Sequence, residues 1–169
     1  GYKLLGLAQE GYEGQESAKQ LTRLKIKAAF ALGVAAVLMT LAFTPLLDDL
    51  TPRVANLVRL ALATPVQLWA CAQFYTSAWG ALKHRAANMN TLIAVGTTVA
   101  FGYSAAVTLL ADLALFDAAG HETYFDTAAA IVGLVLLGRF LEGSAKQRAA
   151  RAMRALLELQ PRTARVARD

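Results

Sequence analysis

Met89 and Glu142 are the residues of this chain whose types and positions could do chemistry together. Met89 begins one long apolar run and Glu142 ends another, so both stand where a hydrophobic helix would meet water. A thioether sulfur is a soft ligand for soft metal ions, and a carboxylate at the edge of a membrane helix suggests a function. Two plain alternatives stay open: Met89 could fill space, and Glu142 could reach water or pair with Lys146 one turn on.

The two residues are predicted to lie at similar depth. A polar loop with its tip near Asp117 joins the two runs into a hairpin. Met89 lies about 28 residues before this tip and Glu142 about 25 residues after it, and each residue of a helix advances about 1.5 Å. One incoming ion could therefore contact both side chains.

Asp126 begins the last apolar run at its other end. Its carboxylate could simply be a helix N-terminal acid, which the macrodipole favours. Asp126 and Glu142 are about 16 residues apart, so at about 100° per residue they project to nearly opposite faces of one helix. That helix alone therefore cannot supply a continuous path for an ion.

Four long apolar runs must position these residues, and they predict an all-α membrane protein. Of the 169 residues, 56% are hydrophobic and 17% are charged, which is too apolar for an ordinary soluble domain. The uncharged run from Ala28 to Leu47 is about 20 residues long, enough to cross a bilayer. The weakest run, from Thr123 to Leu141, contains Asp126 and Arg139.

The distribution of charge argues against nucleic acid as a partner, despite a net charge of +5. Basic residues gather at one side of the predicted bundle, and acidic residues dominate the two connections at the other side, so the positive-inside rule places both ends of the chain in the cytoplasm. The plasma (inner) membrane is the expected location. Lys83 and Arg85 could dock an acidic partner or anchor to anionic lipid. The basic residues gather before the first run, between the second and third, and after the fourth: Lys19, Arg23, Lys25, Lys27, Lys83, Arg85, Lys146, Arg148, Arg151 and Arg154.

The chain is predicted to divide into seven segments. Residues 1–16 are read as the tail of a preceding domain and a linker broken by glycines at 11 and 14. A capping box of Ser17 and Gln20 is expected to start the first membrane helix. Membrane helices are predicted at residues 17–47, 54–85, 88–111 and 123–143, followed by a helical extension at 144–160 and the first strand of a soluble domain at 161–169.

The shape of the second helix stays open. Pro65 removes one helical hydrogen bond and should bend the helix. The aromatic and polar segment after Phe74 could lie along the membrane surface as an amphipathic helix, or continue straight as an aromatic belt. Arg59 is expected to reach the outer headgroups. The lone Cys71 could bind Cu(I) but is more often packing filler.

Four motifs stand in the predicted membrane helices: Asn88-Met89-Asn90-Thr91-Leu92-Ile93-Ala94-Val95-Gly96-Thr97, Tyr124-Phe125-Asp126-Thr127-Ala128-Ala129, Leu136-Leu137-Gly138-Arg139-Phe140-Leu141-Glu142 and Thr64-Pro65-Val66-Gln67. Together they resemble the heavy-metal P-type ATPases, and within them the copper(I)-transporting subgroup. The resemblance covers nearly the whole chain. It implies two helices specific to these pumps, then the first two core helices, with residues 1–16 ending a metal-binding domain and residues 161–169 starting an actuator domain.

The resemblance implies the membrane portion of an ATP-driven Cu(I) exporter. Met89 and Glu142 would form its cytoplasmic intake site, and Asp126, where the family more usually has Glu, would assist metal release. Lys83 and Arg85 would receive a copper chaperone or an N-terminal metal-binding domain. The glycine that usually kinks the second helix is absent near Cys71.

The catalytic motifs of such pumps are not in this sequence. Cys-Pro-Cys, Asp-Lys-Thr-Gly-Thr and the Thr-Gly-Glu loop are all missing, so ATP and Mg²⁺ are expected to bind parts of a longer parent chain. This chain is not expected to hydrolyse ATP alone. A pump for Ag(I) or Zn(II), and a non-catalytic four-helix membrane scaffold or metal-binding protein, remain the alternatives.

Overall fold

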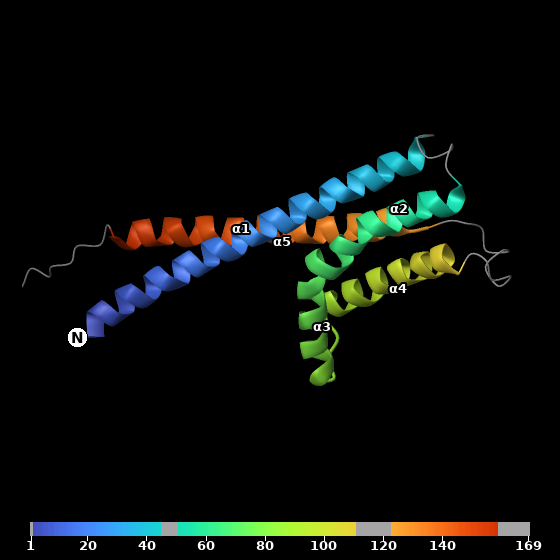
Figure 1. Cartoon of the computed structure of the whole chain (residues 1–169). Helices are drawn as coiled ribbons and strands as arrows, with labels where there is room; N and C mark the ends of the chain where they lie inside the picture. Colours follow the sequence, from blue (N-terminus) through green and yellow to red (C-terminus); the bar gives the residue numbers. More distant parts are fainter. Residues whose placement is uncertain (1, 45–50, 111–122, 159–169) are drawn as a thin grey trace, which may run out of the picture.

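The computed structural model describes residues 2–44, 51–110 and 123–158, and all of the regular secondary structure in them is helical (Figure 1). This confirms the predicted all-α fold. A π-helical turn, Val66–Ala70, joins the second helix to the third. The α-helices are α1 (Tyr2–Phe43), α2 (Pro52–Pro65), α3 (Ala72–Lys83), α4 (Met89–Leu109) and α5 (Phe125–Glu158).

Three stretches within the described ranges are long and apolar enough to cross a membrane. They are Glu16–Phe43 in α1, Met89–Leu109, and Phe125–Met153 in α5. The bent pair formed by Pro52–Ala70 and Ala72–Lys83 makes a fourth span if it counts as one. These lengths indicate an integral membrane protein surrounded by lipid.

The predicted glycine break near the start of the chain is wrong. α1 runs without interruption through Gly11 and Gly14, and Ser17 and Gln20 lie inside it instead of starting a new helix. An interior glycine costs only about 1 kcal/mol relative to alanine, whereas a second helix would need a new and costly nucleus. Residues 159–169, where a strand was predicted, lie outside the described part of the chain.

The second membrane segment is bent by 51° where α2 gives way to α3. Pro65, which lacks an N–H donor, ends α2, and the following turn is wound with a hydrogen bond from Cys71 N to Val66 O of 3.0 Å. Such π turns and prolines are recognised causes of helix kinks. The bend therefore forms although no glycine stands near Cys71, and Figure 1 shows α3 leaving the direction of α2.

α1 and α5 pack along each other through small residues. A Cβ added at Gly133 of α5 would lie 3.0 Å from Cγ and Cδ2 of Leu32 in α1. The fully buried Leu38, Val132 and Leu136 continue this contact into the core. Close backbone approach of this kind suits membrane helices, because lipid supplies no hydrophobic drive between them. A Cβ added at Gly96 of α4, by contrast, would meet nothing within 4 Å.

Candidate functional site

The first turn of α4 lies beside the turn of α5 that precedes Glu142. Asn90, the residue after Met89, accepts a hydrogen bond from Nη2 of Arg139. Arg139 stands three positions before Glu142, which places the two on neighbouring turns of α5. The structure thus brings together the two helix segments that carry Met89 and Glu142.

Both predicted intake residues are accessible. Met89 is 61% exposed, and the Glu142 side chain is 63% exposed. Glu142 Oε1 accepts a hydrogen bond from Nζ of Lys146 at 2.7 Å, as one of the plain alternatives had it. An ion pair between such exposed side chains is weak, so it leaves the carboxylate open to exchange with another cation.

Met89 is the first residue of α4 because Asn88 caps the helix. The Asn88 side chain accepts a hydrogen bond from Thr91 N at 3.0 Å, and Thr91 Oγ1 accepts one from Asn88 N at 3.4 Å. This reciprocal capping box satisfies free N–H groups of the first turn. The capping box therefore fixes the start of α4, and Met89 is the first residue of that helix.

Asp126 lies in the first turn of α5 and is half-buried. It lines a small cavity of about 40 Å³ with Arg59 of α2 and Leu38 of α1. Asp126 is about 24 Å along the helix axis from Glu142 at 1.5 Å per residue. Asp126 therefore lies at the start of α5 and Glu142 near its middle, because α5 continues beyond Glu142 to Glu158.

Arg59 does not simply reach for headgroups. Its Nη2 donates to Leu41 O of α1 at 3.2 Å, and its Nη1 donates to Asn56 Oδ1 at 3.1 Å. The helical partner of Leu41 O would be the N–H of residue 45, which is a proline and has none. Arg59 thus donates to Leu41 O in place of the backbone N–H that a proline at position 45 lacks.

Cys71 is fully buried at the bend, with Sγ 3.7 Å from Oγ1 of Thr97 in α4. No group of three or more His, Cys, Asp or Glu side chains in the described residues could hold a metal ion. These contacts suit the packing role of Cys71 better than a ligand role.

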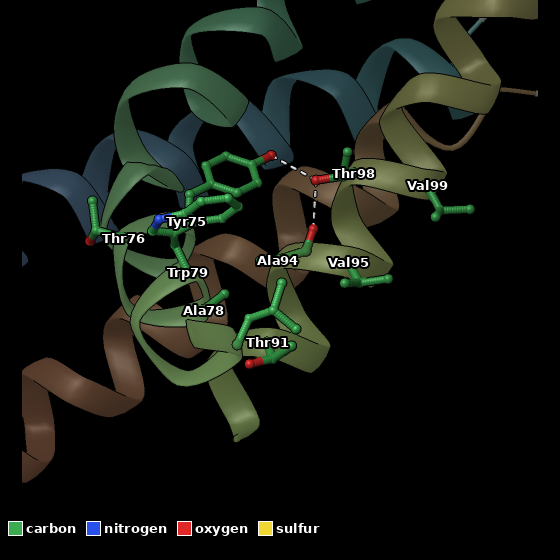
Figure 2. Close-up of a pocket in the computed structure, with 10 residues that line it drawn as sticks. Tyr75, Thr76, Ala78, Trp79, Thr91, Ala94, Val95, Thr98 and Val99 are labelled. Atoms are coloured by element: carbon green, nitrogen blue, oxygen red, sulfur yellow. Dashed lines mark hydrogen bonds between the residues drawn. The ribbon is translucent and has the colours of Figure 1, made fainter. Parts of the chain in front are cut away.

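A groove of about 610 Å³ lies between α3 and α4 and is lined by residues of both helices (Figure 2). Tyr75 and Trp79 come from α3, and Val95 and Val99 from α4. The Tyr75 hydroxyl lies 2.8 Å from Oγ1 of Thr98, which itself donates to Ala94 O. This hydrogen bond joins α3 to α4 between two residues that line the groove.

Lys83 and Arg85 are exposed at the end of α3. Ala86 N donates to Ala81 O and Arg85 N to Leu82 O, both at 2.9 Å, which is a Schellman C-cap. Arg85 occupies the position with positive φ, 53°, that glycine normally takes. Both cations therefore project where α3 meets the start of α4.

The sequence reasoning missed the side chains that join these elements. Arg139, noted only as a charge within an apolar run, contacts Asn90 of α4 and lies 4.9 Å from the ring centroid of Phe74 in α3. A charged residue inside a membrane helix was the available signal, because such residues usually face a partner in the bundle.

Comparisons with known proteins identify relatives of the chain. A "Probable copper-transporting ATPase" of Synechocystis sp. is 35% identical, over 99% of this chain and 23% of the relative. A "Probable copper-importing P-type ATPase A" of Enterococcus hirae is 33% identical, over 92% of this chain and 21% of the relative. A "Copper-exporting P-type ATPase" of Bacillus subtilis is 40% identical, over 66% of this chain and 14% of the relative.

No protein-family model matches the chain, and no solved structure matches it at a significant level. The chain spans less than a quarter of the length of the three relatives. The relatives nevertheless cover between them nearly every residue described above. The chain is homologous to part of the copper-transporting P-type ATPases.

Proposed function

We propose that this chain forms membrane helices of an ATP-driven Cu(I) pump, with its metal intake at Met89 and Glu142. One observation carries the proposal: an exposed thioether and an exposed carboxylate stand on adjoining helix segments, linked by Asn90 and Arg139. A soft sulfur ligand favours Cu(I) over harder ions, and the names of the relatives agree.

The direction that we propose is export. Lys83, Arg85 and Lys146 lie near the Met89 end of the bundle, and the positive-inside rule assigns such an end to the cytoplasm. Metal taken up there leaves the cytoplasm. The relatives are named for both directions, so the proposal rests on charge placement.

Glu142 suits a transient ligand because its present partner is easily displaced. Lys146 is itself 76% exposed and belongs to the same helix, so a cation that binds Glu142 displaces a single surface contact. Asp126, at the far end of α5, is proposed to assist release, since the nearby Arg59 lines the same cavity. ATP and Mg²⁺ are proposed to bind other parts of the complete pump.

The test uses the complete pump and measures Cu(I)-stimulated ATP hydrolysis. Met89→Ala combined with Glu142→Gln should raise the KM for Cu(I) and lower the activity at limiting metal. Met153→Ala and Glu16→Gln are matched controls, because both residues are exposed in the structure and neither is a proposed ligand. Unchanged KM in the double variant would refute the intake assignment.

The same assay separates the alternatives. Stimulation by Ag(I) as strong as by Cu(I) would indicate a pump for both soft ions, and stimulation by Zn(II) alone would contradict the Cu(I) proposal. A complete protein that hydrolyses no ATP under any of the three ions would favour a non-catalytic scaffold or metal-binding protein.

A further inference from the structure

One side chain, Arg139, contacts two other helices. Its Nη2 donates to Asn90 Oδ1 in the first turn of α4, and its guanidinium lies 4.9 Å from the Phe74 ring centroid in α3. Asn90 Nδ2 in turn donates to Ser77 Oγ of α3 at 2.6 Å. The Asn90 amide thus joins two helices, with its oxygen bonded to α5 and its amino group to α3. We call Ser77, Asn90, Arg139 and Phe74 the three-helix clamp.

The clamp is adjacent to both proposed intake ligands. Asn90 follows Met89 directly, and Arg139 lies three positions before Glu142. Few neighbours restrict the side chains of the two proposed ligands, since both are more than half exposed. The hydrogen bond between Asn90 and Arg139 links the backbone segments that carry them.

Arginine fits this position for physical reasons. The guanidinium is planar, so it can stack on the Phe74 ring while its N–H groups point at Asn90. Phe74 is fully buried, which fixes the ring against which the cation lies. The charge of Arg139 is held by an amide oxygen and an aromatic face, which leaves Glu142 to its separate contact with Lys146.

We propose that Arg139 is a positioning residue that couples the placement of α3 to the spacing of Met89 and Glu142. The proposal rests on the intake function proposed above. α3 holds two of the four clamp residues, Phe74 and Ser77, and it follows a bend of 51°. A displacement of α3 at this bend moves both residues, and through Arg139 and Asn90 it changes the gap between the two ligands.

The coupling gives the exposed end of α3 a role in metal affinity. Lys83 and Arg85 stand on α3 and its C-cap, about two turns beyond Ser77. Whatever binds these cations acts on a helix that the clamp connects to the intake. The affinity of the intake for Cu(I) therefore depends on the position of α3, through one arginine.

The test compares KM and kcat for Cu(I) in the complete pump, with free Cu(I) set by a soluble chelator. Arg139→Gln and Asn90→Ala should each raise KM about tenfold, equivalent to about 1.4 kcal/mol, because each removes a hydrogen bond to a charged group. The combination should raise KM by less than the product of the two single effects, because both variants break the shared contact between Asn90 and Arg139. The kcat at saturating Cu(I) should stay within about twofold.

Two control variants remove similar groups outside the clamp. Thr76→Val deletes a hydroxyl that donates only to Gln73 O within α3, and Arg148→Gln removes an exposed cation of α5. Both should leave KM unchanged. Arg139→Lys keeps the charge but loses the planar fork, so it should give an intermediate KM even if the Gln variant fails to fold.

Met89→Ala, measured alongside, separates this proposal from the proposed function. If KM rises in Met89→Ala but stays normal in Arg139→Gln and Arg139→Lys, the intake stands and the coupling is wrong. Normal KM in all three overturns both proposals. If the Arg139 variants only reduce the yield of folded pump, while the remainder shows normal KM, Arg139 merely stabilises the helices and the coupling is also overturned.

Discussion

Replacement of Gly133 by alanine should destabilise the contact between α1 and α5, whereas the same change at Gly138 should not. The new Cβ at 133 would lie 3.0 Å from Cγ and Cδ2 of Leu32 and 3.1 Å from its backbone nitrogen. The backbone nitrogen cannot rotate away, so the helices must separate, and overpacking of this kind costs about 1–3 kcal/mol. A Cβ at Gly138 meets nothing within 4 Å.

The comparison isolates the steric effect because both variants gain the same helix propensity. Alanine is favoured over glycine in a helix interior by about 1 kcal/mol, and this gain is common to the two sites. The difference between the two variants should therefore equal the clash alone, about 1–3 kcal/mol in favour of Gly138→Ala.

The assay is thermal unfolding of the complete protein in detergent, followed by the fraction that remains monodisperse on size-exclusion chromatography. The midpoint of Gly133→Ala should fall below that of the wild type, and the midpoint of Gly138→Ala should equal or exceed it. Leu32→Ala added to Gly133→Ala should recover the part of the loss due to the leucine side chain. Equal midpoints for the two glycine variants would refute the close approach of α1 and α5 at Gly133.

Two further predictions concern the second membrane segment. Cys71→Gly should leave the bend unchanged and Pro65→Ala should reduce it, because the proline and the π turn cause the bend. Distances between spin labels at the ends of α2 and α3 measure the bend. A larger bend in the glycine variant would contradict this cause. Arg59→Met should lower the thermal midpoint, because Leu41 O loses the donor that Pro45 cannot supply, at a cost of about 1–3 kcal/mol. An unchanged midpoint would mean that another group replaces Arg59.

The helices of this protein could be predicted because their signal is local. Uncharged runs of membrane length and charged connections appear directly in the sequence, and the start of α4 at Met89 follows from Asn88, a preferred capping residue. The helix start predicted at Ser17 and Gln20 was wrong because the longer sequence around the motif outweighs it. The motif can be satisfied locally, but the apolar sequence on both sides continues one helix through it.

Contacts between helices were harder to predict because they depend on which faces meet. Gly96 and Gly133 are both glycines inside apolar helices, yet a Cβ would meet Leu32 at Gly133 and nothing within 4 Å at Gly96. Similar depth of the Met89 and Glu142 segments followed from counting residues along the hairpin. The link between Asn90 and Arg139 did not, because it requires the rotation of both helices about their axes.

α5 is a single helix of 34 residues without a proline, so it can act as a lever. Measured from Phe125 at about 1.5 Å per residue, Glu142 is about 25 Å and Glu158 about 50 Å along its length. A tilt of about 10° around the Phe125 end would then carry Glu142 sideways by about 4 Å and Glu158 by about 9 Å. Such a swing exceeds the length of a metal–ligand bond, so in the proposed intake a push at the far end of α5 would be enough to part Glu142 from an ion bound to Met89.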